Sequence, residues 1–188
     1  PKAYPIDGVF CAHDIAPEMY RLFSEGLPKG DTIGQREFDE HMSFVPGQMT
    51  VVTGIPNHGK SEFMDHVAER LSVFCGWRFG IFSPENFPIS LHLAKYVEKV
   101  LGKSIDKEKN KMTLEEMEGA MDFLQNNFFF IRPRDENFSL DNILERARML
   151  VAKYGIRGLV IDPWNTIEHQ IPPGVNEPNY VSNQRAKL

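Results

Sequence analysis

The sequence predicts an α/β domain with a mainly parallel sheet flanked by helices. Short apolar runs, of the length of buried strands, alternate along the chain with longer segments whose apolar residues recur at helical spacing. No internal repeat or low-complexity tract interrupts this alternation. With 188 residues, of which 41% are hydrophobic and 25% charged, the chain has the size and balance of one compact domain.

Residues 1–45 are less regular than the rest, and we expect them to form a segment separate from a core at 46–188. Asp14 is placed to cap a helix that continues to about Ser24. Glycines and a proline between residues 26 and 30 end that helix. A Pro-Gly turn at 46–47 then opens the core.

Four strands are expected in the core, because four short runs are rich in apolar or β-branched residues. The first run is uncharged throughout and leads into a glycine-rich turn. A glycine stands directly before the second, and another lies within the fourth. In chain order, the expected strands are 48–53, 77–83, 128–131 and 156–162.

Helices are expected to connect these strands. Residues 60–75 carry apolar side chains three and four positions apart, and so do 89–101 and 140–154. Thr113 and Glu116 have the spacing of a capping box, which predicts the start of one more helix. The alternation of these helices with the strands is typical of a parallel sheet.

Composition excludes several classes of protein. A formal net charge of −5 argues against a broad basic surface that coats nucleic acid. The two cysteines, Cys11 and Cys75, form neither a C-x-x-C motif nor a Cys/His cluster, so neither a zinc site nor a disulfide framework is expected. No apolar run approaches the roughly 20 residues that cross a bilayer, and residues 1–7 lack the apolar segment of a secretory signal. We therefore expect a cytoplasmic protein with no membrane partner.

A phosphate-binding loop is the most specific motif of the chain. It matches G-x-x-x-x-G-K-[ST] in full and reads Gly54, Ile55, Pro56, Asn57, His58, Gly59, Lys60, Ser61. The glycines let the backbone approach a phosphate closely, and the amides that open the following helix point at it. Lys60 is expected to reach the β- and γ-phosphates of ATP, and the Ser61 hydroxyl to hold Mg²⁺. We count the next residue, Glu62, with this nucleotide-binding segment. His58 either contacts phosphate or faces solvent.

Two carboxylates have positions suited to ATP hydrolysis. Asp162 ends an apolar strand, and ligands of parallel α/β sheets lie beyond the carboxyl ends of the strands, so Asp162 could take Mg²⁺ or one of its waters. Glu85 follows the strand 77–83 and could orient and deprotonate the attacking water. From the residues alone, a surface glutamate at the start of a helix is an equally good interpretation of Glu85.

In their order along the chain, these motifs resemble the RecA-like motor domain of DnaB-like replicative helicases. The resemblance is closer to the Twinkle-type primase–helicases of phages and mitochondria. It is carried by PGQMTVVTGIPNHGKSEFMD, GIFSPEN and GIRGLVIDPWN. The segment GVFCAHDIAPEMYRLFSEGLPKGDTIG is also similar to the linker that precedes this domain in that group and docks onto a neighbouring subunit.

The resemblance implies a RecA-like P-loop NTPase that hydrolyses ATP with Mg²⁺ and moves along single-stranded DNA. It implies that Glu85 is the catalytic base, and that Lys60, Ser61 and Asp162 take the roles described above. It further implies a homo-hexameric ring with DNA in its central channel, and a primase domain or primase partner.

Two features of the family, the polar γ-phosphate sensor and the arginine finger, would lie beyond Leu188. Residues 180–188 have the pattern of a helix that is only beginning. We therefore expect this core to be incomplete at its C-terminal side. An arginine finger contributes about 10³–10⁵ in rate, so we expect little turnover from the fragment alone.

Several other residues keep two interpretations. Arg132 and Arg134 either meet DNA or are solvated. Trp164 either stacks on a base or packs beside the site. The loop 170–179 lies where related helicases carry a DNA-facing loop, but it contains no Lys or Arg.

Two other classes of function fit parts of the pattern. A RecA-like recombinase or a KaiC-like regulatory ATPase would use the same P-loop and carboxylates to drive assembly or timing. A small-molecule P-loop kinase is a third class, and the lack of an evident Arg-rich lid weighs against it.

Overall fold

The computed structural model describes residues 8–27, 29–132 and 138–167. It divides into two compact units, Pro1–Gly30 and Asp31–Leu188. The segment 31–44 is part of the second unit, because Ile33 and Phe44 are buried in its core. The functional boundary expected after residue 45 remains a prediction.

The first unit contains one described helix, α1 (Ala12–Glu25). The backbone N–H of Cys11 donates to Asp14 Oδ2 at 2.8 Å, so Asp14 caps from inside the first turn and the helix begins two residues before Asp14. None of the helix residues is buried within the described residues. Its exposed apolar side chains include Met19, Tyr20 and Phe23.

A three-stranded parallel sheet forms the centre of the second unit. Its order is β2 (Phe128–Phe130), β1 (Phe79–Phe82), β3 (Gly158–Ile161). In the register, Phe79 lies between Phe128 and Gly158. All four residues of β1 are buried, as expected of a central parallel strand that is covered on both faces. The parallel α/β architecture predicted from the sequence is confirmed.

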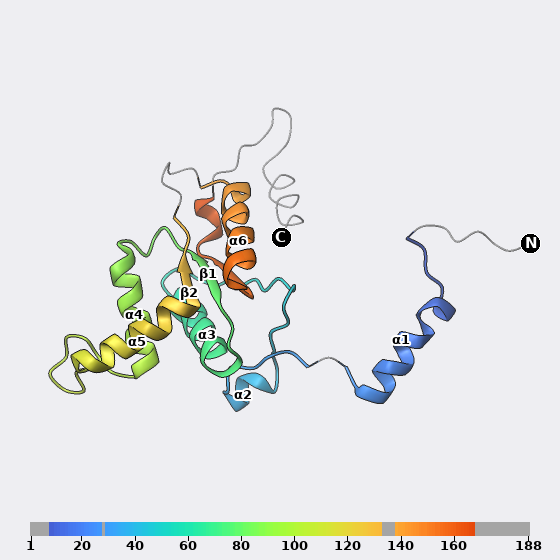
Figure 1. The fold of residues 1–188 in the computed structure, drawn as a ribbon, viewed down its shortest axis with the longest axis horizontal. Helices are drawn as coiled ribbons and strands as arrows, with labels where there is room; N and C mark the ends of the chain where they lie inside the picture. Colours follow the sequence, from blue (N-terminus) through green and yellow to red (C-terminus); the bar gives the residue numbers. More distant parts are fainter. Residues whose placement is uncertain (1–7, 28, 133–137, 168–188) are drawn as a thin grey trace, which may run out of the picture. The chain divides into compact units, whose positions relative to one another are not determined.

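Helices cover both faces of this sheet (Figure 1). The second unit contains α2 (Arg36–Asp39), α3 (Lys60–Cys75), α4 (Ile89–Leu101), α5 (Leu114–Asn127), α6 (Leu140–Tyr154) and the 3-10 helix η1 (Trp164–Thr166). The bounds of α3, α4 and α6 agree with the prediction. Thr113 and Glu116 form the predicted capping box of α5, with the Glu116 N–H donating to Thr113 Oγ1 and the Thr113 N–H to Glu116 Oε2. The single-turn elements α2 and η1 are too short to show a helical period in the sequence.

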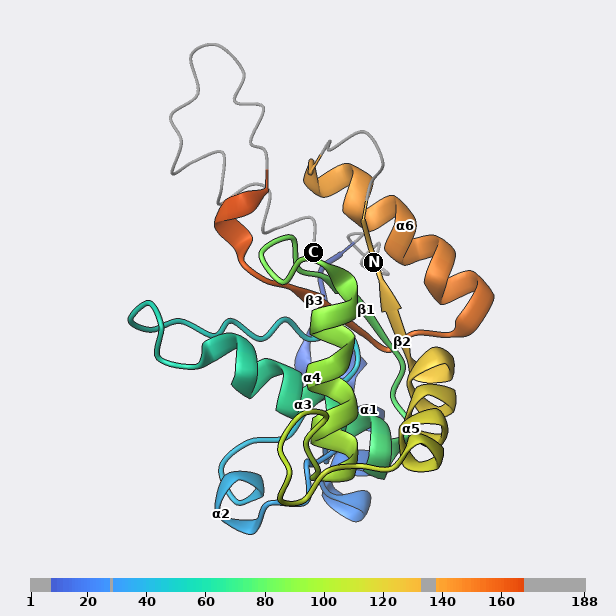
Figure 2. The same ribbon diagram turned by 90° about the vertical axis from the view of Figure 1, so that its left-hand side faces the viewer.

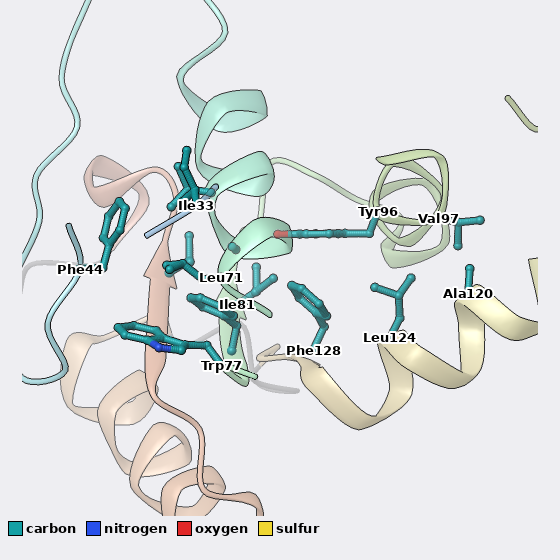
Figure 3. Close-up of a cluster of buried hydrophobic side chains, with 14 of the residues drawn as sticks. Ile33, Phe44, Leu71, Trp77, Ile81, Tyr96, Val97, Ala120, Leu124 and Phe128 are labelled. Carbon is teal, nitrogen blue, oxygen red and sulfur yellow. The ribbon is translucent and has the colours of Figure 1, made fainter. Parts of the chain in front are cut away.

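Successive side chains of β1 point to opposite faces of the sheet, and the buried core accordingly consists of two clusters. Phe79 and Ile81 lie in the larger cluster, with buried residues of α3, α4 and α5, whereas Phe82 lies in the smaller cluster against α6. Figure 3 shows the larger cluster, in which Tyr96 of α4 reaches toward α3. Phe79 stacks with Trp77 and Phe128, each at 5.9 Å between ring centroids.

The predicted strand 48–53 is wrong. The segment has no strand structure, and Met49, Val51 and Val52 are exposed, with 62% of Val51 accessible. Figure 2 shows it as an irregular trace that leads into α3. The preference of Thr and Val for strands depends on packing against neighbouring strands. In the part of the chain that the structure describes, β3 pairs with β1 on one side and this segment does not join its other side.

Some predictions fall on residues that the structure does not describe. These are the helix expected at 180–188, the loop 170–179 and the residue Arg134. Among the described helices, none has the length and apolar character needed to span a bilayer.

Candidate active site

The loop from Gly54 to Ser61 ends in a sharp turn onto the start of α3. Asn57 (φ 63°) and Gly59 (φ 78°) both adopt left-handed backbone angles, which Asn tolerates and Gly adopts without cost. No atom lies within 4 Å of a Cβ built on Gly59, so the backbone angle, and not lack of space, favours glycine there. Gly59 is the residue before the helix, and its carbonyl accepts the first helical hydrogen bond, from Phe63 N–H at 2.9 Å.

The Lys60 side chain folds back over this loop. Its Nζ donates to the carbonyl oxygens of Gly54 at 3.1 Å and of Ile55 at 2.9 Å. The ammonium group therefore lies on the loop that the motif assigns to phosphates. His58 is exposed, in agreement with a solvent-facing position.

Two lysines of α4 bind the carboxylate of Glu62. Lys95 Nζ lies 2.9 Å from Glu62 Oε1, and Lys99 Nζ donates to Glu62 Oε2. Hydrogen bonds from Lys99 and then Lys95 lower the pKa of Glu62 to about 2. Glu62 was expected to belong to the nucleotide-binding segment. In the structure, its carboxylate links the first turn of α3 to α4.

Glu85 lies in a turn directly after β1. The turn is closed by the Asn86 N–H, which donates to the Ser83 carbonyl at 3.3 Å, and by Asn86 Nδ2, which donates to Ser83 Oγ at 2.9 Å. Glu85 itself is exposed. Its neighbours therefore fix the backbone of the turn while its carboxylate stays open to solvent.

Asp162 follows β3 at the same edge of the sheet. Its N–H donates to the Phe82 carbonyl at 2.9 Å, which continues the β1–β3 pairing one residue beyond Ile161. Glu85 comes three residues after Phe82, so both carboxylates stand at the carboxyl ends of adjacent strands. In open α/β sheets this edge is where ligands bind.

A buried polar cluster joins the helix of the P-loop to the helix that follows Glu85. Asp65 of α3 accepts a hydrogen bond from the Tyr96 hydroxyl at 2.8 Å and lies 3.1 Å from His92 Nε2. All three side chains are buried. Burial raises the pKa of Tyr96 well above its ordinary value, and the Asp65 carboxylate adds to this effect, followed by Asp162 and Glu62. Tyr96 therefore lies within electrostatic reach of carboxylates from α3 and from the end of β3.

The structure thus places the predicted site residues in two groups. One group is Glu85 with Asp162 at the sheet edge, and the other is Lys60 with Ser61 at the start of α3. Among the described residues, no hydrogen bond or ion pair connects the two groups directly. Both are attached to α4, which binds α3 through Glu62 and Asp65 and binds the Glu85 turn through the bond from Lys95 to Asn86.

The sequence prediction did not include Asp65, His92, Tyr96 or Lys95. Asp65 and His92 fall on the buried faces of their helices, where a charged or titratable residue needs a partner. That mismatch is a signal in the sequence. The pairing itself links positions 27 residues apart and depends on how two helices pack.

Two residues with open interpretations are placed by packing. The Arg132 guanidinium lies 3.8 Å from the centre of the Phe87 ring, and Phe87 is 58% exposed. Trp164 packs against the smaller core cluster beside Asp162. Neither observation tests a contact with DNA.

The residues present fit a nucleoside triphosphate with Mg²⁺. Asn57 and Gly59 have left-handed backbone angles, which occur in backbone turns that bind anions, and the Lys60 ammonium group lies on the same loop. The Ser61 hydroxyl lies in the first turn of α3. Within residues 8–27, 29–132 and 138–167, no three Asp, Glu, His or Cys side chains converge on one point. A Mg²⁺ that takes one hydroxyl, one carboxylate and otherwise waters and phosphate oxygens does not require such a cluster.

Comparison with known proteins agrees with the motifs. No family model matches the chain. The chain is 38% identical over 195 aligned residues to the Twinkle homolog protein, chloroplastic/mitochondrial, of Arabidopsis thaliana. The alignment covers 100% of this chain and 27% of that relative, so the chain spans little more than a quarter of the relative's length. By its sequence motifs and by this similarity, the chain is related to the Twinkle- and DnaB-like helicases.

Proposed function

We propose that this chain is the ATPase motor of a replicative DNA helicase, in which hydrolysis of Mg²⁺–ATP drives movement along single-stranded DNA. The observation that carries the proposal is the sheet edge: Glu85 and Asp162 follow neighbouring strands there, and α4 ties this edge to the P-loop helix. The relationship to the Twinkle- and DnaB-like helicases supports DNA as the polymer along which the motor moves.

Each residue has a separate role in this proposal. Lys60 and the backbone N–H groups of residues 54–61, except Pro56, bind and orient the phosphates, and the Ser61 hydroxyl would hold Mg²⁺. Asp162 would hold Mg²⁺, either directly or through a water. Glu85 takes the proton of the water that attacks the γ-phosphate, and its exposed position leaves it free to meet that water.

The assembly and location remain proposals as well. We propose a homo-hexamer that encloses the DNA, with a primase domain or primase partner. The sequence favours the cytoplasm, whereas the relative's name refers to chloroplasts and mitochondria. Location therefore stays a prediction for this chain.

The test is ATPase activity of the protein at full length, with and without single-stranded DNA. DNA should stimulate turnover, Glu85→Gln should lower kcat by about 10²-fold or more while nucleotide still binds, and Lys60→Ala should lose nucleotide binding. Glu118→Gln, which changes an exposed glutamate of α5, is the matched control and should behave as wild type.

Other outcomes point to the other classes. DNA-independent turnover with filaments on DNA would favour a recombinase, and autophosphorylation would favour a regulatory ATPase. Phosphate transfer to a metabolite would favour a kinase. A fully active Glu85→Gln variant would refute the assignment of the base.

A further inference from the structure

We propose that Lys95 is a positioning residue, which holds the Glu85 turn in register with the start of the P-loop helix. The inference rests on the proposed function, because it assigns Lys95 a part in ATP hydrolysis. In the described part of the chain, Lys95 has no hydrogen bond or ion pair with Lys60, Ser61, Glu85 or Asp162. It acts through its two partners.

Lys95 bridges two elements that each carry predicted site residues. Its Nζ lies 2.9 Å from Glu62 Oε1, and Glu62 directly follows Ser61 in the first turn of α3. The same Nζ donates to Asn86 Oδ1 at 3.3 Å, and Asn86 directly follows Glu85. One ammonium group therefore connects the residue after the proposed magnesium-binding serine with the residue after the proposed base.

The connection continues through the turn to the other side of Glu85. Asn86 Nδ2 donates to Ser83 Oγ at 2.9 Å, so the amide that accepts from Lys95 also ties the two ends of the turn together. The result is an unbroken path of polar contacts, Glu62–Lys95–Asn86–Ser83. Because Glu85 lies between Ser83 and Asn86, the path fixes the backbone from which its carboxylate projects.

Lys95 projects from a helix that is itself firmly held. One residue further along α4, Tyr96 is fully buried and donates to Asp65 of α3. His92, one turn earlier, is bound to the same carboxylate. A side chain on such a support loses less freedom when it bridges two groups than it would on a loop.

A comparison with Lys99 distinguishes a positioning role of Lys95 from simple neutralisation of the Glu62 charge. Lys99 also pairs with Glu62, and of the two lysines it makes the larger contribution to the ionised state of that carboxylate. Among the described residues, however, Lys99 has no hydrogen bond or ion pair with the Glu85 turn. If Lys95 only neutralised Glu62, the two lysines would be equivalent; the bond to Asn86 is what distinguishes them.

The experiment compares Lys95→Met with Lys99→Met in the protein at full length. Lys95→Met should lower kcat by about ten- to a hundredfold, since a small misplacement of a catalytic group costs up to about that much. Its KM and its affinity for a fluorescent ATP analogue should stay within about twofold of wild type, because the P-loop is unchanged. Lys99→Met should leave kcat within about twofold. Lys95→Arg, which can still bridge two oxygens, should recover most of the loss.

Amide hydrogen exchange gives a readout independent of turnover. Exchange at residues 83–87 should be faster in Lys95→Met than in wild type, and unchanged in Lys99→Met. Equal loss of kcat in the two methionine variants, or unchanged exchange at 83–87, would overturn the positioning role.

Failure of this inference differs from failure of the proposed function. An active wild type, an inactive Glu85→Gln and an unimpaired Lys95→Met would refute the role of Lys95 and leave the motor assignment standing. A wild type that hydrolyses no ATP would refute both.

Discussion

Two parts of this molecule share one sequence pattern and differ in structure. In each, an apolar run leads into a turn and then into an amphipathic helix: β1, the Glu85 turn and α4 in one case, and 48–53, the P-loop and α3 in the other. The run in the first case is a fully buried central strand. The run in the second is exposed and has no strand pairing. The difference teaches that local pattern decides a turn and a helix, whereas a strand also needs its neighbours.

The helices that follow the two runs, α3 and α4, do not differ in this way. α3 buries Val67 and Leu71 in the same cluster as Tyr96 and Val97 of α4. The structural difference between the two parts therefore lies in the residues before Gly59. The P-loop is fastened to the core on its helix side, through Glu62 and Asp65, and is open on its strand side.

A large effect on stability is expected where the two helices α3 and α4 meet. Asp65→Ala leaves the buried Tyr96 hydroxyl and His92 ring without their shared acceptor, and should lower the free energy of unfolding by about 3 kcal/mol. Asp65→Asn keeps the volume and one acceptor and should cost less. Urea denaturation measures both, with Glu118→Ala as the exposed control. A loss of less than about 0.5 kcal/mol for Asp65→Ala would mean that the cluster does not hold α3 to α4.

The two runs themselves give the most direct comparison. Ile81→Ala empties a fully buried position in β1 and should cost about 2–5 kcal/mol. Val51→Ala changes an exposed side chain and should cost less than about 0.5 kcal/mol. Thermal or urea unfolding distinguishes these values. Comparable losses would show that 48–53 is packed as a strand in solution, and the contrast between the two parts would disappear.

Two glycines test how closely β1 is packed against β3. A Cβ at Gly158 would lie 2.2 Å from the Phe79 ring, which is held between Trp77 and Phe128, so Gly158→Ala should cost about 1–3 kcal/mol. Gly119 lies inside α5, where an added methyl group would have no atom within 4 Å, and Gly119→Ala should stabilise by about 0.5–1 kcal/mol. Opposite signs in the same unfolding assay are the expected result. A neutral Gly158→Ala would indicate that β1 and β3 separate easily.

The smallest effect is the pH dependence of the Glu62 contact. Its pKa falls from an ordinary value of 4.5 to about 2 in the folded protein, so its stabilising contribution is complete above pH 4.5 and is lost as the pH falls toward 2. Because Glu62 is half exposed, the contribution should be no more than about 1 kcal/mol. Glu62→Gln should flatten stability over this window, and Glu118→Gln should not. An unchanged slope in Glu62→Gln would show that the lysines do not hold the carboxylate in solution.

Most of the fold could be predicted from the sequence, because its signals are local. Thr113 and Glu116 announce the start of α5, and apolar spacing delimits α3, α4 and α6. The strand at 48–53 could not be decided in this way, since Val51 and Val52 have the same composition whether or not a neighbour pairs with them. The fold class follows from the alternation as a whole and does not depend on that one segment.

The candidate site was predicted in part. The motif supplies the loop from Gly54 to Ser61, and strand ends supply Glu85 and Asp162. The roles of these residues in catalysis remain predictions. Lys95 and Asp65 were not predicted, because their partners lie on other elements and only the packing of α4 against α3 brings them together. The sequence alone does not distinguish a long polar side chain that bridges two elements from one that is solvated.

The chain has two tryptophans, and the fold gives them different surroundings. Trp77 is buried, stacks on Phe79 and donates its indole N–H to Asp31 at 2.6 Å. Trp164 is half-buried and stands two residues after Asp162, at the edge of the sheet where nucleotide is proposed to bind. Intrinsic fluorescence of this protein is therefore the sum of one emitter inside the core and one beside the site. With Trp77 replaced by Phe, the remaining emission would come from Trp164 alone, and the protein would carry its own optical reporter of the Asp162 region.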